Sequence, residues 1–118
     1  FGNLPEQDRF LEAMADAASS VVNYFHGNAV YINIMKNISV DCDCDGNASA
    51  PCMQDIGILA STDPVAVDQA CLDLVYNSTD PGKDKLIARI ESLHGVHTVE
   101  AAADLGVGTR EYEFISIA

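Results

Sequence analysis

Hydrophobic side chains recur at intervals of three and four residues from Pro5 to about Phe25, which is the spacing of one face of a helix. The residues of this face are Phe10, Met14, Ala17, Ala18, Val21 and Phe25. Glu6 and Asp8 stand at the start of the segment, where the helix dipole favours negative charge. The pattern predicts an amphipathic helix that ends near Gly27.

Apolar and polar side chains then alternate with a period of two over residues 30–40, interrupted only at Lys36. This alternation predicts a long strand that leads straight into a segment rich in cysteine and aspartate. The short apolar run at residues 56–60 is typical of a second strand, covered on both faces. The two predicted strands therefore flank the cysteine and aspartate segment.

A helix start is encoded immediately after the second strand, at residues 61–64. Asp63 has the side chain of an N-cap residue, and Pro64 fits the first helical position, where no backbone N–H is needed. The inward face of this helix would carry Val67, Ala70, Cys71, Leu74 and Val75. The remaining pattern predicts helices over 83–93 and 98–105 and a last strand over 112–117.

This order of elements predicts an α/β fold, as a single small domain over residues 1–118 with a mixed or partly parallel sheet and helices packed on it. A chain of 118 residues is long enough for one hydrophobic core. If the strands are parallel, the segments 41–55 and 61–68 both follow strand ends at the same edge, where α/β folds bind ligands. We therefore expect these two segments to share one crevice.

The charge balance favours cations or basic partners. The chain has 6 basic residues against 18 acidic ones, a net charge of -12, which repels nucleic acid and anionic lipid surfaces. No apolar run approaches the roughly 20 residues that cross a bilayer. We expect a cytoplasmic protein without a nucleic-acid or membrane partner.

The chain begins at Phe1, which is neither a Met nor the start of a leader peptide, so we expect it to be a piece of a longer protein. Two of its four cysteines, Cys42 and Cys44, stand too close together to link distant segments by a disulfide. The expectation is therefore a reducing interior, and whether the cysteines are free, disulfide-bonded or metal-ligating stays open at this point.

Residues 41–47 crowd thiols and carboxylates into one turn-prone loop. Side chains two apart on an extended chain point the same way, so Cys42 and Cys44 could present both sulfurs to one ion. Thiolates suit iron or zinc, and a zinc site needs four ligands. The candidates to complete the set are Cys52 together with Asp55, His94 or His97.

Calcium is the competing interpretation of the same loop. Asp41, Asp43 and Asp45, followed by Gly46, match positions one, three, five and six of a calcium-binding loop. The match fails at position twelve, where a bidentate glutamate belongs and Cys52 stands instead. The loop also follows a predicted strand rather than a helix. Calcium therefore ranks behind iron and zinc.

Ser61, Asp63 and Asp68 form a second candidate site, for an anionic substrate or a divalent cation. A helix N-terminus attracts anions, and Asp68 lies one turn further along the same predicted helix. The simpler interpretation of Asp63 is a helix cap. No Ser, His and Asp order of a hydrolase and no H-E-x-x-H motif is present, so the sequence does not decide whether the chain is an enzyme.

Three blocks of the sequence together resemble a known family. They are Cys42-Asp43-Cys44, the stretch from Asp55 to Val75, and the stretch from Leu105 to Glu113. Their combination is similar to that of the uncharacterised iron-sulfur-centre proteins known as domain-of-unknown-function family 362. Members often carry a ferredoxin-like module with C-x2-C-x2-C cysteines, and these are absent from this chain.

The resemblance implies that the chain is the C-terminal part of an iron-sulfur-associated protein whose ferredoxin-like module lies elsewhere in the same protein. The positions that match the recurrent family motif are Cys42, Asp43, Cys44, Ser61, Asp63, Pro64 and Asp68. An iron-sulfur cluster would then lie in the attached module, and this chain would interact with that module or with another redox partner.

The leading hypothesis is therefore a domain that binds a metal ion, or docks a cluster, through the Cys/Asp loop. Its metal ligands would be Cys42, Asp43, Cys44 and Cys52. One alternative is an enzyme domain in which Ser61, Asp63 and Asp68 bind an anionic substrate or a divalent cation. Another is a calcium-stabilised or purely structural interaction domain.

Overall fold

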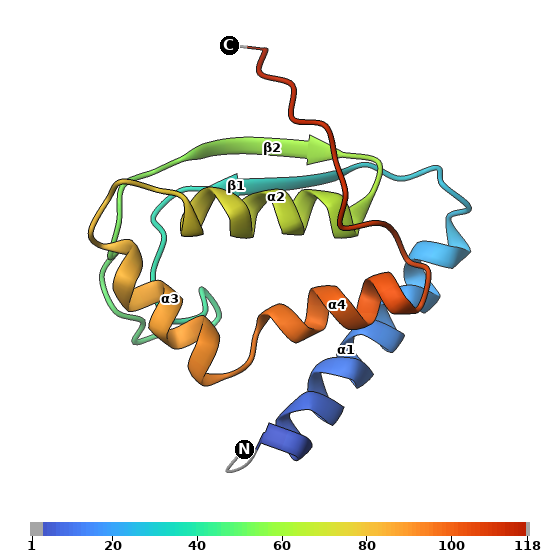
Figure 1. The fold of residues 1–118 in the computed structure, drawn as a ribbon, viewed down its shortest axis with the longest axis horizontal. Coiled ribbons are helices and arrows are strands. Elements are labelled where there is room, and N and C mark those ends of the chain that lie inside the picture. The colour runs from blue at the N-terminus through green and yellow to red at the C-terminus, as the bar shows by residue number, and fades with distance from the viewer. Residues whose placement is uncertain (1–3, 118) are drawn as a thin grey trace.

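A computed structural model of the protein describes residues 4–117, which form four helices and one sheet of two strands (Figure 1). In chain order these are α1 (Leu4–Tyr24), β1 (Tyr31–Met35), β2 (Gly57–Ser61), α2 (Pro64–Tyr76), α3 (Lys83–Ser92) and α4 (Val96–Asp104). Helix α2 packs on the sheet, and α4 lies between α2 and α1 (Figure 1). The predicted α/β class of a single small domain is confirmed.

All four predicted helices are present, with small differences at their ends. Helix α2 begins as predicted, with Pro64 in its first turn and Asp63 as a side-chain cap. Among the helices of residues 4–117, none combines the length and apolar character needed to cross a bilayer.

The two strands run antiparallel, with Tyr31 paired to Ser61 and Met35 paired to Gly57. The parallel pairing that we expected is not found in the described part of the chain. An antiparallel pair places the end of β1 beside the start of β2. The loop after β1 therefore leaves one end of the sheet and α2 starts at the other, so the expected shared crevice is not formed.

One face of the sheet lies on α2, and the other face is open. Along β1, Asn33 is half-buried, whereas its neighbours Ile32 and Ile34 are 61% and 66% exposed. The strand is also shorter than the alternation predicted. It ends at Met35, two residues before Asn37, which adopts a left-handed conformation (φ 53°) and turns the chain out of the sheet.

The hydrophobic core is small and is centred on α2. Its buried members are Val65, Ala66, Val67, Ala70 and Val75 of α2, Val99 and Ala101 of α4, Leu11 and Ala15 of α1, and Met53 from the loop between the strands. Cys71, which the pattern placed on the inward face of α2, is half-buried. The core therefore joins three helices through mostly small side chains.

Helix α1 buries a different face from the one that its pattern predicted. Leu11 and Ala15, one turn apart, are buried, whereas Phe10, Met14 and Val21 of the predicted apolar face are 43%, 48% and 57% exposed. Helix α4 is the main element packed on α1. One neighbouring helix covers only a stripe of another helix, and here that stripe runs through Leu11 and Ala15, so the predicted apolar face stays open to solvent.

The last predicted strand, over residues 112–117, is not formed. This segment has no regular structure and passes alongside β2 before it turns away from the domain (Figure 1). Side-chain bonds hold its start to α2, since the Tyr112 hydroxyl donates to Asp73 at 2.6 Å. Alternation alone does not make a strand, because a strand also needs a backbone partner.

Candidate functional site

The loop between β1 and β2 is tied across its base. The N–H of Cys52 donates to the carbonyl oxygen of Ile38 at 2.8 Å, and the N–H of Asn37 donates to the Asp55 carboxylate at 2.9 Å. These bonds hold the two arms of the loop together just beyond the sheet. Residues 42–51 form the exposed end of the loop.

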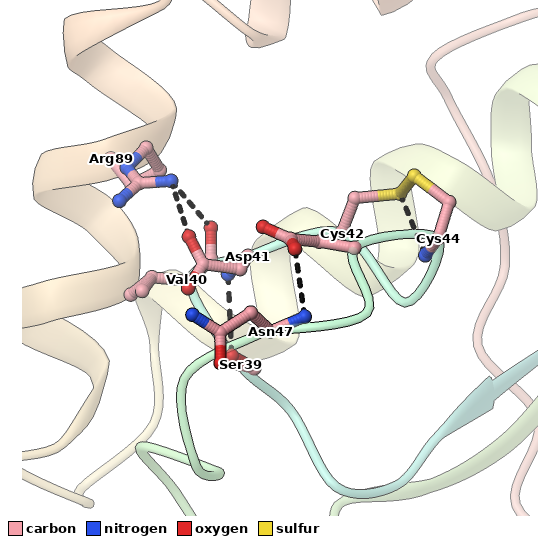
Figure 2. The surroundings of a disulfide bond; sticks show 8 residues. Ser39, Val40, Asp41, Cys42, Cys44, Asn47 and Arg89 are labelled. Atoms are coloured by element: carbon pink, nitrogen blue, oxygen red, sulfur yellow. Dashed lines mark hydrogen bonds and ion pairs between the residues drawn. A yellow bond between two sulfur atoms is a disulfide. The ribbon is translucent and has the colours of Figure 1, made fainter.

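A disulfide bond joins Cys42 and Cys44 at this exposed end (Figure 2). The backbone turns tightly there, because the N–H of Asp45 donates to the Cys42 carbonyl oxygen at 2.9 Å. The sequence left the state of these cysteines open, and the structure brings the two sulfurs together in a bond. A bridge over two positions closes a very short loop, so it connects no distant segments.

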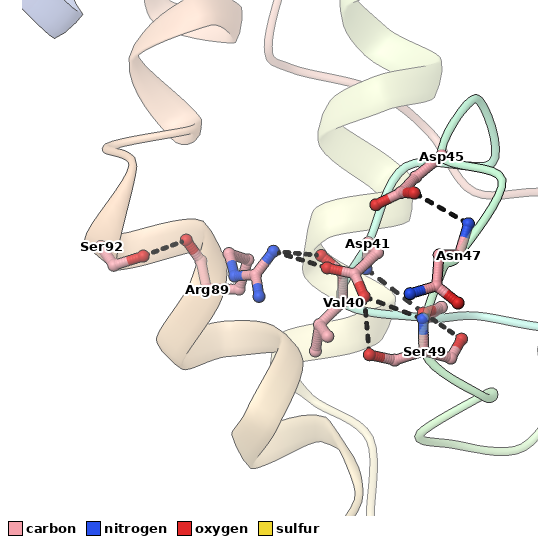
Figure 3. Close-up of polar contacts among 8 residues, drawn as sticks. Val40, Asp41, Asp45, Asn47, Ser49, Arg89 and Ser92 are labelled. Carbon is pink, nitrogen blue, oxygen red and sulfur yellow. Dashed lines mark hydrogen bonds and ion pairs between the residues drawn. The ribbon is translucent and has the colours of Figure 1, made fainter. Parts of the chain in front are cut away.

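The carboxylate of Asp41 organises the loop beside this disulfide (Figure 3). One of its oxygens, Oδ2, accepts bonds from the backbone N–H and the hydroxyl of Ser49 at 2.8 Å and 2.6 Å. The other oxygen, Oδ1, accepts a bond from Arg89 at 3.0 Å. The bonds from Ser49, followed by the bond from Arg89, lower the pKa of Asp41 from 3.8 to about 2. Asp41 is therefore an internal anchor of the loop.

The calcium interpretation requires the carboxylates of this loop to converge on one point. Asp41 is bonded to Ser49 and Arg89, and Asp45 accepts a bond from the N–H of Asn47 at 2.9 Å. These are the local bonds of a turn in which the aspartates satisfy nearby backbone and side-chain donors. The carboxylates of Asp41 and Asp45 therefore have structural partners within the protein.

The predicted metal ligands are only partly brought together. Within residues 4–117, no group of three or more His, Cys, Asp or Glu side chains is arranged to hold a metal ion. The sulfurs of Cys42 and Cys44 are adjacent, but Cys52 lies at the base of the loop as a free, half-buried cysteine. A complete metal site thus needs ligands in addition to Cys42 and Cys44, and metal binding stays a prediction.

The two histidines considered as further ligands have partners elsewhere. His94 pairs through Nδ1 with Asp8 at 2.5 Å, and His97 pairs through Nε2 with Glu12 at 3.0 Å, so both bind helix α1. Their rings stack with centroids 5.3 Å apart. These pairs hold α1 beside α4 and do not belong to the Cys/Asp loop.

Asp63 is fully engaged in structural bonds at the start of α2. Its Oδ1 accepts bonds from the N–H groups of Val65 and Ala66 at 2.9 Å and 3.0 Å. Its Oδ2 accepts a bond from the N–H of Thr109 at 2.9 Å, and its own N–H donates to the Ser61 hydroxyl at 3.0 Å. The carboxylate thus occupies the helix N–H groups that an anionic substrate would use.

Asp68 faces the middle of the sheet rather than the Cys/Asp loop. Its Oδ1 accepts a bond from the side-chain amide of Asn33 at 2.7 Å, and the same amide donates to the Cys71 sulfur at 3.4 Å. Burial raises the pKa of the Cys71 thiol, which favours its protonated form. Cys71 therefore lacks the thiolate character of a reactive cysteine.

Sequence reasoning did not find Arg89 as a partner of the loop. Arg89 lies 48 positions beyond Asp41 and bonds it from helix α3. The only signal in the sequence is the scarcity of basic residues, 6 in all, which makes any one of them a strong candidate to pair with a carboxylate. No spacing rule identifies which carboxylate that is.

Fold and site together define a small α/β domain with a two-cysteine loop at one end of its sheet. The chain belongs to the family described as a domain of unknown function (DUF362), whose family model matches residues 3–73, more than half of the chain. This confirms the family expected from the sequence, and the match itself assigns no iron-sulfur centre. No curated protein and no solved structure matches the chain.

Proposed function

We propose that this chain is a redox-active domain of an iron-sulfur-associated protein, with Cys42-Asp43-Cys44 as its reacting element. The observation that carries the proposal is the exposed disulfide between Cys42 and Cys44. A bridge between residues two apart contributes little to the stability of the fold. An exposed sulfur pair, by contrast, is accessible to thiols of other molecules.

The proposed reaction is reversible thiol-disulfide exchange with an external dithiol. One thiolate of the dithiol attacks a sulfur of the Cys42–Cys44 bond, forms a mixed disulfide and releases the other cysteine, which takes up a proton. The second thiol of the dithiol then displaces the first cysteine. Two electrons and two protons have moved to the cysteine pair, and the external dithiol leaves as a disulfide.

The reduced pair is also the form in which a metal could be held. Thiolates, but not disulfide sulfurs, are ligands for iron or zinc, so Cys42 and Cys44 with the adjacent Asp43 would provide part of a ligand set. The remaining ligands would come from Cys52 or from a ferredoxin-like module or redox partner docked on the loop. The iron-sulfur association rests on the resemblance of this loop and of the Asp55 to Val75 stretch.

Redox titration of anaerobically purified protein tests the exchange reaction. The protein is equilibrated in glutathione buffers, and its thiols are then alkylated and located by mass spectrometry. We expect one pair, Cys42 and Cys44, to change state reversibly, and Cys42→Ser or Cys44→Ser to abolish the change. Cys71→Ser is the matched control and should leave it intact. A pair that never re-forms its bond in oxidising buffer contradicts the proposal.

Elemental analysis and visible absorbance of the reduced protein test the metal. Iron or zinc that is present in the natural protein and lost in both the Cys42→Ser and the Cys44→Ser variant supports metal binding by the loop. Retention of the metal in these variants assigns it elsewhere. If the protein contains no metal and a chelator does not change its melting temperature, the metal and calcium hypotheses are both excluded. Thiol exchange is then the remaining function of the loop.

A further inference from the structure

An ion pair connects the Cys/Asp loop to the helical body of the domain. The guanidinium of Arg89, on α3, donates to the Val40 carbonyl oxygen and to Asp41 Oδ1, both at 3.0 Å (Figure 3). Asp41 is the residue immediately before Cys42. Arg89 therefore fixes the backbone at the point where it enters the disulfide turn.

The same carboxylate fixes the backbone where it leaves this turn. Asp41 accepts two bonds from Ser49, and the Ser49 carbonyl oxygen accepts a bond from the Ser39 hydroxyl at 2.9 Å. Residues 39 and 41 precede the disulfide, and residue 49 follows it. The network thus closes the loop around Cys42 and Cys44, and Figure 3 shows the bonds of Asp41 with Ser49 and Arg89.

We propose that Arg89 is a positioning residue that, through Asp41 and Ser49, favours the disulfide form of the Cys42–Cys44 pair over its dithiol form. A disulfide forms only when its two cysteines lie in a narrow range of relative positions. A loop that is already closed on both sides of the pair loses less conformational entropy when the bond forms. This inference rests on the proposed redox function of the loop.

The positive charge of Arg89 acts in the opposite direction. A nearby cation stabilises thiolates, so charge alone favours the reduced pair. Removal of the charge without any positioning effect would therefore make the disulfide harder to reduce. Removal of the positioning effect makes it easier to reduce. The sign of the change thus separates the two contributions.

The reduction potential of the pair in Arg89→Gln and Ser49→Ala variants tests the inference. Arg89→Gln removes the ion pair from a side chain that is 45% exposed, so folding should be retained. Ser49→Ala loosens the same network without changing any charge. We expect each variant to shift the equilibrium with glutathione about threefold to tenfold towards the dithiol, where tenfold corresponds to about 30 mV.

Arg110→Gln is the matched control, because it removes the same charge from a residue that bonds Gln69 on α2 and not the loop. It should leave the potential unchanged. Suppose that the natural protein shows a reversible couple, but the potentials of Arg89→Gln and Ser49→Ala are unchanged or more negative. That result overturns the positioning role of Arg89 but not the redox function of the loop. The absence of a reversible couple in the natural protein overturns both.

Discussion

The carboxylate of Asp63 accepts a bond from the backbone N–H of Thr109, 46 positions later in the chain, at a distance of 2.9 Å. The same carboxylate caps α2 through the N–H groups of Val65 and Ala66. Gly108 lies so close that a Cβ atom placed on it would be 2.0 Å from Asp63 Oδ1. One side chain therefore determines both where α2 begins and where the C-terminal segment attaches.

Asp63→Ala should destabilise the domain by about 0.5–2 kcal/mol, the usual loss for a helix cap, and should also free the C-terminal segment. Urea unfolding measures the first effect and amide exchange of Thr109 the second. Asp16→Ala is the control, because it removes an exposed carboxylate from the middle of α1. It should change neither the stability nor the exchange of Thr109. Unchanged exchange at Thr109 would show that the segment is held by other contacts.

Gly82→Ala should destabilise the domain by about 1–3 kcal/mol, because a Cβ atom at this position would lie 1.9 Å from the backbone oxygen of Cys52. Gly82 has φ -61°, so the substitution causes no backbone strain and its effect is steric. Gly46→Ala is the matched control, since no atom beyond its two neighbours in the chain lies within 4 Å of the added Cβ. Thermal unfolding of the two variants should separate them, and equal melting temperatures would contradict the close approach of α3 to the loop.

Leu11→Ala should destabilise the protein by about 2–5 kcal/mol, because the Leu11 side chain is only 7% exposed at the contact of α1 with α4. Val21→Ala, on the same helix but 57% exposed, should have a much smaller effect. Chemical denaturation compares the two directly. The reverse order would mean that α1 buries the face predicted from its periodicity and not the face seen in the structure.

His97 should make the attachment of α1 depend on pH. The bond to Glu12 raises the pKa of His97 above its ordinary value of 6.5. Burial acts in the opposite direction, and the negative charges of Asp8, Glu12 and Glu100 add to the rise. Because the folded pKa is raised, the stabilisation is fully present below pH 6.5 and is lost as the pH rises through the folded pKa.

Amide exchange of α1 should therefore be faster above the folded pKa of His97 than at pH 6, after correction for the intrinsic pH dependence of exchange. His97→Gln should reduce this difference, and so should Glu12→Gln. His26→Gln is the control, because His26 lies in the turn after α1 and outside these pairs. An unchanged pH dependence in His97→Gln would show that the pair of His97 with Glu12 is not its cause.

The helices were the part of the fold that local sequence determined best. A side-chain cap and a proline in the first turn both favour a helix start, and Asp63 and Pro64 provide them at adjacent positions. The Cys/Asp loop was likewise recognised as the chemically distinctive segment. Its family was recognised too, because the Asp55 to Val75 stretch is a long local pattern, part of which lies in the matched region.

Strand direction and partners were decided only by the tertiary structure. Periodicity describes one segment at a time, whereas strand pairing depends on what lies next to each segment. Three features have this origin: the antiparallel register of β1 and β2, the open face of Ile32 and Ile34, and the unpaired segment 112–117. The exposed apolar face of α1 has the same origin, since α1 packs on α4 and buries a different face, with Leu11 and Ala15.

The sequence by itself identified the pair Cys42 and Cys44, in an acidic loop, as candidate functional residues, because residue type and spacing are local properties. The tertiary structure decided how the candidate residues are arranged. It joined the two sulfurs, engaged Asp41 with Arg89 from a distant helix, and placed Ser61 and Asp63 at the other end of the sheet. These outcomes depend on long-range packing and strand direction, which no local pattern specifies.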